Sequence, residues 1–136
     1  MSDLTPSQLD LLRAARQARE KAYAPYSGFP VGAALRLRDG RVFMGANVEN
    51  ASFGLTVCAE RVALFATAAA VGREAMNVEA IAVDAGEGTP ASPCGACRQV
   101  MAELAPDAVV IWSDAVAPHV SPVTALLPDT FRLDRR

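Results

Sequence analysis

Three cysteines and one glutamate are the residues best able to do chemistry in this chain. Glu60 stands two residues after Cys58, and Cys94 and Cys97 are three apart. Three thiolates are one ligand short of a closed tetrahedral zinc site, and the open fourth position is where a catalytic zinc holds water. Glu60 could carry the proton of that water. The pattern therefore predicts a catalytic zinc centre with Cys58, Cys94 and Cys97 as ligands.

Both groups of cysteines fall where helices are expected to begin. Ser92 and Pro93 come directly before Cys94, so a helix is expected over 95–104. The sulfurs of Cys94 and Cys97 would then lie on one face of its first turn. A second helix is expected from Cys58 to Val71, ended by Gly72. Unpaired N–H groups at helix starts favour thiolates, and Arg61 or Arg98 could offset the remaining negative charge.

The spacing of Cys58 and Glu60 sets a geometric condition. Residues two apart on a helix point roughly 200° apart around its axis. Both side chains can therefore serve one metal only if Cys58 lies at or before the first turn with non-helical backbone angles. Thr56 is a nearby cap candidate that would allow this.

Three simpler interpretations compete with a catalytic zinc. Cys94 and Cys97 could be a redox pair, but that leaves Cys58 unexplained. All three thiols could be buried core residues. A non-catalytic zinc module would need a fourth ligand, and His119 is the only histidine. It lies between Pro118 and Val120 in what is expected to be a proline-bounded loop, and it is better interpreted as a surface residue.

Composition limits the class of protein. At 136 residues, with 51% hydrophobic and 21% charged residues, the chain is expected to form one folded domain over 1–136. A net charge of −2 without a Lys/Arg run favours a small neutral substrate over a nucleic-acid polymer. We expect no membrane span, because no apolar run approaches roughly 20 residues. The polar N-terminus and an odd number of cysteines indicate the cytoplasm.

The elements that must position these residues follow from apolar spacing and turn residues. A hairpin followed by alternating helices and strands predicts a three-layer α/β/α sandwich with a mixed sheet. The expected elements are a helix from Thr5-Pro6 to Ala24, stopped by Pro25; strands 31–38 and 41–48 around a two-residue Asp39-Gly40 turn; strands 79–85 and 108–112; and a helical fragment at 124–127.

The stretch 59–71 is apolar nearly all round, with only Glu60, Arg61 and Thr67 polar. Such helices are buried on every side, and a domain this small can hardly enclose one. A partner subunit is therefore expected to cover it, although a central core helix is the alternative.

Four motifs in order resemble the small homotetrameric cytidine deaminases, over almost the whole chain. They are Ala24-Pro25-Tyr26-Ser27-Gly28-Phe29-Pro30-Val31-Gly32-Ala33-Ala34, Asn47-Val48-Glu49-Asn50-Ala51-Ser52-Phe53-Gly54-Leu55, Cys58-Ala59-Glu60-Arg61 and Ser92-Pro93-Cys94-Gly95-Ala96-Cys97-Arg98-Gln99. The Cys-Ala-Glu and Pro-Cys-x-x-Cys segments also match the zinc deaminase signature, with Cys in place of His.

The resemblance implies a five-stranded sheet, one Zn²⁺ per subunit and a homotetramer. It implies deamination of cytidine and 2′-deoxycytidine in pyrimidine salvage, in which zinc-activated water attacks C4 and Glu60 moves the protons. A deaminase of another nucleoside or of a nucleoside antibiotic is the nearest rival.

The resemblance also implies roles for individual residues. Asn47 and Glu49 would hold the ribose hydroxyls, Phe29 would pack against the base, and the Ala59 backbone would contact the pyrimidine edge. Phe53 and Phe131 would reach a neighbouring subunit's pocket, and Arg61 would compensate the charge of the cysteines. Gly28, where many relatives carry a longer residue, and the tail after Pro128 depart from the pattern.

Overall fold

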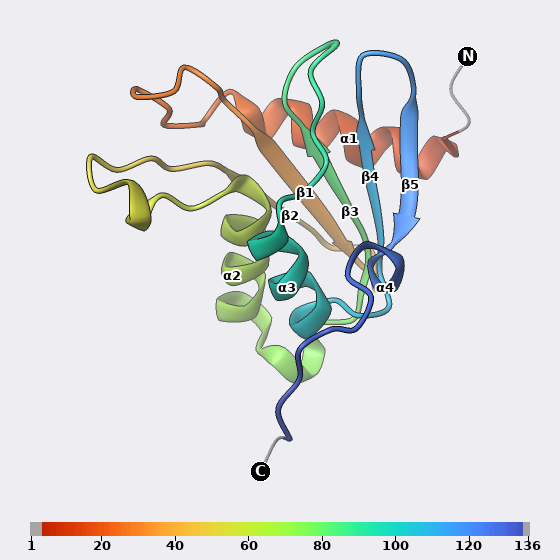
Figure 1. The fold of residues 1–136 in the computed structure, drawn as a ribbon. Coiled ribbons are helices and arrows are strands. Elements are labelled where there is room, and N and C mark those ends of the chain that lie inside the picture. The colour runs from red at the N-terminus through yellow and green to blue at the C-terminus, as the bar shows by residue number, and fades with distance from the viewer. Residues whose placement is uncertain (1–3, 135–136) are drawn as a thin grey trace.

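A mixed sheet between two layers of helices forms the centre of the computed structural model, which describes residues 4–134. Within that range the sheet has five strands in the order β2-β1-β3-β4-β5, with β3 and β4 parallel and the other pairs antiparallel. Helix α1 covers one face, and α2 and α3 cover the other (Figure 1). The predicted three-layer α/β/α sandwich is therefore confirmed. The elements are α1 (Pro6–Arg19), β1 (Gly32–Leu37), β2 (Val42–Ala46), α2 (Ala59–Val71), β3 (Val78–Asp84), α3 (Gly95–Leu104), β4 (Val109–Ser113), β5 (Pro118–Pro122) and α4 (Val123–Leu126), with single 3₁₀ turns at Phe53–Leu55 and Arg73–Ala75.

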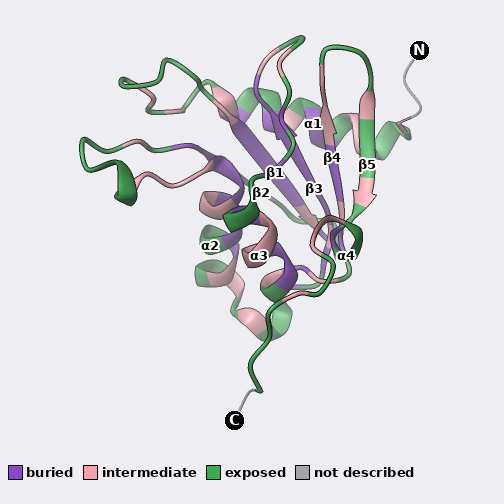
Figure 2. Cartoon of the chain, viewed as in Figure 1, coloured by how far each residue is buried: buried purple, intermediate pink, exposed green. Residues whose placement is uncertain are grey.

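The two faces of the sheet form two apolar clusters, because successive strand residues point to opposite sides. On β1, Leu35 belongs to the cluster under α2 and α3, whereas Ala34 belongs to the cluster under α1 with Leu11 and Ala15. Figure 2 shows burial concentrated in β1, β3 and β4 and in the helix faces turned toward them. The helices at whose starts the cysteines lie thus pack on a buried apolar sheet.

The β1–β2 hairpin has a longer connection than predicted. The Leu37 N–H donates to the Arg41 carbonyl and the Gly40 N–H donates to the Leu37 carbonyl, both at 2.9 Å. Arg38, Asp39 and Gly40 therefore form a three-residue loop, and Gly40 adopts a left-handed φ of 99°. The prediction of a two-residue turn was wrong, because the glycine takes the left-handed position that ends a three-residue loop.

Helix α1 begins where predicted but ends earlier. Thr5 caps it, accepting from the Gln8 N–H at 3.1 Å, and the helix stops at Arg19 instead of continuing to residue 24. The Tyr23 N–H donates to the Asn47 carbonyl at 2.9 Å. This pairing with a distant strand end competes with helix continuation, so the prediction that Pro25 stops the helix was wrong.

Strand β5 was not located from the sequence. Pro118 and Pro122 bound it, and it pairs with β4 at the edge of the sheet. Proline is tolerated on an edge strand because its missing N–H faces away from the ladder. His119 therefore lies in a strand and not in a loop.

Two glycines let helices approach the sheet closely. A Cβ on Gly45 would lie 2.5 Å from the Ala63 nitrogen and 2.7 Å from the Ala59 oxygen, so β2 packs directly against the first turns of α2. A Cβ on Gly32 would lie 2.0 Å from the Ala15 oxygen of α1. Neither position has room for a larger residue. Within 4–134, no helix has the length and apolar character that crossing a membrane requires.

Candidate metal centre and active site

Cys58 and Cys94 are the N-cap residues of α2 and α3. Their backbone angles are extended, with φ −68° and ψ 154° at Cys58 and φ −72° and ψ 172° at Cys94. The condition set by the spacing of Cys58 and Glu60 is therefore met, because Cys58 lies outside the helix that carries Glu60. Thr56 does not cap the helix; its hydroxyl accepts from the Asn50 N–H at 3.2 Å.

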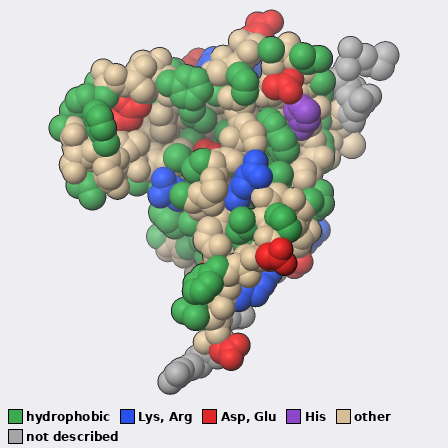
Figure 3. Space-filling model, in the orientation of Figure 1, with side chains coloured by type: hydrophobic (Ala, Val, Ile, Leu, Met, Phe, Trp, Pro, Cys, Tyr) green, Lys and Arg blue, Asp and Glu red, His purple; other side chains and the backbone are tan. Residues whose placement is uncertain are grey.

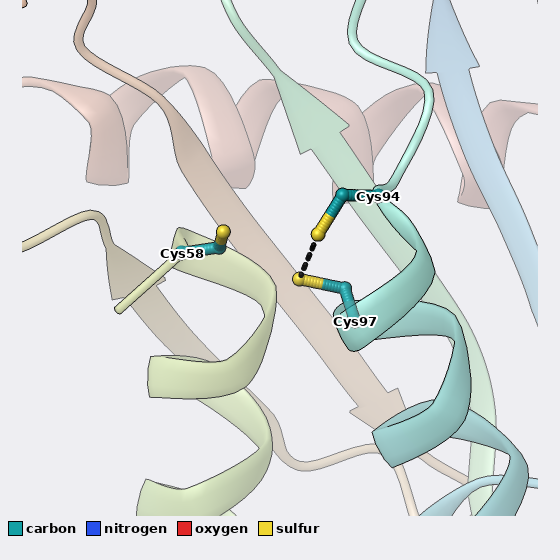
Figure 4. A group of neighbouring side chains, drawn as sticks. All are labelled: Cys58, Cys94 and Cys97. Atoms are coloured by element: carbon teal, nitrogen blue, oxygen red, sulfur yellow. Dashed lines mark hydrogen bonds between the residues drawn. The ribbon is translucent and has the colours of Figure 1, made fainter. Parts of the chain in front are cut away.

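The three sulfur atoms converge between the two helix starts. All lie within 4.8 Å of one another, and the sulfurs of Cys94 and Cys97 are 3.6 Å apart. Figure 4 shows Cys58 on α2 facing the pair on α3. Zinc–sulfur bonds of 2.3 Å in tetrahedral geometry would place sulfurs about 3.8 Å apart. The donor set and its spacing therefore fit a zinc ion held by three thiolates.

Arg61 places a positive charge on one side of this cluster. Arg61 Nη2 lies 3.5 Å from the Cys58 sulfur. Hydrogen bonding from the Cys97 thiol, reinforced by Arg61, lowers the pKa of Cys58 to about 5, whereas the bond to Cys58 and burial raise the pKa of Cys97. Of the thiols of Cys58 and Cys97, that of Cys58 is thus the more readily ionised. Arg98 does not share this role, because its guanidinium nitrogens bond to oxygen atoms.

Glu60 is buried beside the sulfurs, with only 5% of the residue exposed. Burial raises the pKa of this carboxyl, and the negative charge on Cys58 adds to the effect. A carboxyl that does not hold its negative charge strongly can both accept and return a proton.

A cavity of about 210 Å³ opens over Glu60, Cys58 and Cys94. Loops from three parts of the chain line it, together with the start of α2 and the end of β3. The lining residues are Phe29, Val31, Asn47, Thr56, Cys58, Ala59, Glu60, Val83, Ala85, Pro90, Ala91, Ser92 and Cys94.

Asn47 and Glu49 lie just beyond the end of β2, and in this structure both hold the 26–31 loop. Asn47 Oδ1 accepts from the Val31 N–H at 2.8 Å, and its Nδ2 donates to the Phe29 carbonyl at 3.0 Å. The Glu49 carboxylate accepts from the Ser27 hydroxyl and from the N–H groups of residues 26 and 27, which lowers its pKa. Asn47 lines the cavity, whereas Glu49 lines an adjoining hollow with Phe53.

The aromatic residues divide between the cavity and the open surface. Phe29 lines the cavity. Phe53 is 74% exposed and contacts Tyr26 edge-on, with ring centroids 6.1 Å apart. Phe131 is also exposed, and its carbonyl accepts from Gln99 Nε2 at 3.2 Å. The cavity of a single chain therefore includes neither Phe53 nor Phe131.

His119 does not complete the metal site. Among residues 4–134, the group of side chains positioned to hold a metal contains the three cysteines and no histidine. His119 Nε2 instead lies 2.6 Å from Asp114 Oδ2, and its ring stacks on Trp112. The closed, non-catalytic module considered from the sequence is not what the structure has.

The sequence did not indicate the contribution of the loop between β3 and α3. Ala85, Pro90 and Ala91 line the cavity, and the Ala91 N–H donates to the Ser113 carbonyl at 3.2 Å. Small apolar residues carry no chemical signal. Only their position before the Pro-Cys segment could have suggested a cavity wall.

A metal held at three corners, with an acid–base group buried beside it, defines the class of site found in metal-dependent hydrolytic enzymes. Comparison with known proteins identifies the family. The family model for the cytidine and deoxycytidylate deaminase zinc-binding region matches residues 6–113.

Individual relatives agree with that match. A cytidine deaminase of Halalkalibacterium halodurans is 53% identical over 123 residues, which is 89% of this chain and 91% of the relative. One from Mycobacterium tuberculosis is 44% identical over 120 residues, covering 88% and 86%. The crystal structure of cytidine deaminase from Burkholderia pseudomallei is 52% identical, with a TM-score of 0.84, and the match covers 94% of this chain and all of that one. This chain belongs to the zinc-binding cytidine and deoxycytidylate deaminase family.

Proposed function

We propose that this protein deaminates cytidine and 2′-deoxycytidine to uridine and 2′-deoxyuridine, with release of ammonia. The observation that carries the proposal is the burial of Glu60 beside three convergent sulfurs at the base of a cavity. The relatives named cytidine deaminase over nearly their full length support the choice of substrate.

The three cysteines would hold zinc, which supplies Lewis-acid activation of the attacking water. Glu60 accepts a proton from that water as its oxygen adds to C4 of the pyrimidine, and Glu60 gives a proton to ring N3. Glu60 then takes the remaining proton from the oxygen added at C4 and passes it to the amino group, which leaves as ammonia while C4 keeps the oxygen as a carbonyl. The raised pKa of Glu60 suits this cycle, because each step requires the carboxyl to change protonation state.

Other residues of the site would orient the nucleoside. Phe29 and Ala59 line the cavity, and the Phe29 ring and the Ala59 backbone would contact the base there. Asn47 retains a second N–H and a second lone pair beyond its bonds to the 26–31 loop, and the Glu49 carboxylate also has spare lone pairs. Both could therefore receive ribose hydroxyls without releasing the loop.

We extend the proposal to a homotetramer in which Phe53 and Phe131 reach a neighbouring subunit's pocket. Both rings are largely exposed in the single chain, and Phe53 already borders the hollow beside Glu49. A role in pyrimidine salvage in the cytoplasm goes with this reaction, because three cysteines kept as thiolates need a reducing compartment.

A nucleic-acid polymer is not part of the proposal. On the face drawn in Figure 3, Lys and Arg side chains form separate small groups instead of a continuous stripe. The net charge is −2. Polymer-binding proteins usually carry a basic face that neutralises phosphates.

The test is a substrate panel assayed with zinc-loaded protein. Zinc content is measured first, and ammonia release is then followed with cytidine, 2′-deoxycytidine, cytosine, adenosine and a cytosine nucleoside antibiotic. We expect turnover of the first two compounds at one zinc per subunit. Fully loaded protein that turns over neither cytidine nor deoxycytidine would overturn the proposal, and selective turnover of the antibiotic would favour the rival substrate.

A further inference from the structure

Arg98 bonds to three oxygen atoms from two separate segments of the chain. It lies on α3 one residue after Cys97 and is half-buried. Its Nε donates to the Pro93 carbonyl at 2.8 Å, its Nη2 to the Ser92 hydroxyl at 2.8 Å and its Nη1 to the Leu126 carbonyl at 2.9 Å. Every nitrogen of the guanidinium therefore donates a hydrogen bond to an oxygen atom, and none donates to a sulfur.

Two of these acceptors belong to the turn that delivers a zinc ligand. Ser92 and Pro93 precede Cys94, whose side chain makes no capping bond to its own helix. The Ala91 N–H is held by the Ser113 carbonyl on one side of this turn, and the Cys94 carbonyl enters α3 on the other, accepting from the Arg98 N–H at 2.9 Å. Between these two attachments, the Arg98 side chain supplies the bonds that fix the turn to the helix.

The third acceptor connects the turn to the end of the chain. Leu126 is the last residue of α4, and Gln99, next to Arg98, bonds the Phe131 carbonyl farther along. Two consecutive α3 residues thus hold the C-terminal segment, but only Arg98 also holds the segment before Cys94.

We propose that Arg98 is a positioning residue that holds the Cys94 sulfur at zinc-binding distance from the sulfurs of Cys58 and Cys97. The inference rests on the three-cysteine zinc site used in the proposed function. A guanidinium reaches three acceptors because its donors are spread over a rigid plane, whereas a lysine ammonium concentrates its donors on one atom. Lysine would keep the charge but lose the bonding pattern.

The experiment measures zinc affinity and geometry without substrate. Arg98→Lys is compared with wild type by competition against a chromogenic chelator and by the visible spectrum of the Co²⁺-loaded protein. Replacing a residue that hydrogen-bonds to a metal ligand typically lowers the metal affinity 10- to 100-fold. We expect the zinc dissociation constant to rise roughly 10- to 100-fold and the Co²⁺ bands to change in position and intensity.

Two control variants separate positioning from general destabilisation. Arg73→Lys alters an arginine whose Nη2 bonds the Glu103 carbonyl at 3.1 Å, at the other end of α3. Gln99→Leu releases the Phe131 carbonyl without touching the Cys94 turn. We expect both to keep wild-type zinc affinity and the wild-type Co²⁺ spectrum.

A folded Arg98→Lys protein with zinc affinity within twofold of wild type and an unchanged spectrum would overturn the inference, as would an equal loss in Arg73→Lys. If Arg98→Lys does not fold, Ser92→Ala serves instead, because it removes one acceptor from an exposed residue. Unchanged affinity in Ser92→Ala would then refute positioning. Since no arm uses a nucleoside, failure of the substrate panel would leave this result standing.

Discussion

Glu60 experiences two opposing electrostatic effects within one helix turn. Burial and the negative charge on Cys58 disfavour its ionised form, whereas its own backbone N–H and Arg61 favour it. The pKa of Glu60 is therefore raised. A raised pKa suits the proton-transfer role that we propose for this side chain.

Glu60→Gln should separate these roles. The amide keeps the size of the carboxyl but cannot accept the proton, so kcat should fall roughly 10²- to 10⁴-fold. Zinc content should stay at one per subunit, because the three cysteines are unchanged. Steady-state kinetics and metal analysis check both outcomes.

Glu74→Gln is the matched control, since Glu74 is an exposed residue in the 3₁₀ turn after α2. It should leave kcat unchanged. Wild-type turnover in Glu60→Gln would remove Glu60 from the mechanism.

Site residues could be predicted from the sequence only where their side chains have distinctive chemistry. Cys58, Glu60 and the pair on α3 were found because thiolates and a carboxylate at this spacing serve few purposes other than metal chemistry. The bonds of Asn47 to the 26–31 loop and of Arg98 to Pro93 could not be found this way. They depend on backbone groups brought close by folding, and backbone groups leave no mark in the sequence.

At the scale of elements, the packing of α2 on β2 sets the position of the site. Cys58 caps α2, and the first turn of the helix carries Ala59 and Glu60. A Cβ on Gly45 would meet the same part of α2 at the Ala59 oxygen and the Ala63 nitrogen. Gly45→Ala should push the helix away from the sheet. Overpacking of this kind costs about 1–3 kcal/mol of unfolding free energy. It should also weaken zinc binding several-fold, because Cys58 moves relative to α3.

Gly32→Ala distinguishes the two effects. Its Cβ would meet the backbone of α1 on the opposite face of the sheet. We expect a comparable loss in unfolding free energy, measured by urea denaturation, but no change in zinc affinity measured by chelator competition. Equal zinc loss in both variants would show that Gly45 has no special connection to the site.

The β4–β5 hairpin gives an element-scale prediction in pH. Asp114 accepts from the N–H groups of Ala117 at 2.9 Å and Val116 at 2.7 Å and contacts His119, and these bonds lower its pKa from 3.8 to about 2. Because the folded pKa lies below the ordinary value, the ionised carboxylate stabilises the hairpin above pH 4. That stabilisation is lost as the pH falls through about 2.

Asp114→Ala should therefore be less stable than wild type near neutral pH, and the difference should shrink between pH 4 and pH 2. Urea unfolding of both proteins across this range measures it. A difference that is constant with pH would mean that the carboxylate charge plays no part in holding the turn.

The bounds of an element were predicted well where nearby residues determine them. They were predicted poorly where a partner distant in the sequence determines them. Helix α3 was predicted at its observed bounds, since its capping segment and apolar spacing are local. The end of α1 depends on the pairing of Tyr23 with Asn47, and β5 depends on the free edge of β4. Neither partner can be inferred from the residues of the segment itself.

At the scale of the whole molecule, apolar surface remains uncovered near the edge of the sheet formed by β2. Phe65 on α2 is 48% exposed, and Ala66, Ala69 and Ala70 on the same helix are exposed as well. Met44 on β2 adds to this surface. The alternative of a helix enclosed in the core is therefore wrong for the single chain, and the expectation that a partner subunit covers 59–71 stays a prediction. Large exposed apolar surface usually marks an interaction site.

Phe65→Glu tests whether other subunits cover this face. A carboxylate in an apolar interface would lose its hydration without gaining a partner, so the proposed tetramer should dissociate into smaller species. Light scattering at micromolar concentrations measures the mass of each species. Val116→Glu is the matched control, because Val116 is 92% exposed at the tip of the β4–β5 hairpin and should keep the wild-type mass. A wild-type protein that is monomeric and fully active would contradict the tetramer, because every contact that Phe53 and Phe131 are proposed to make would then have to arise within one chain.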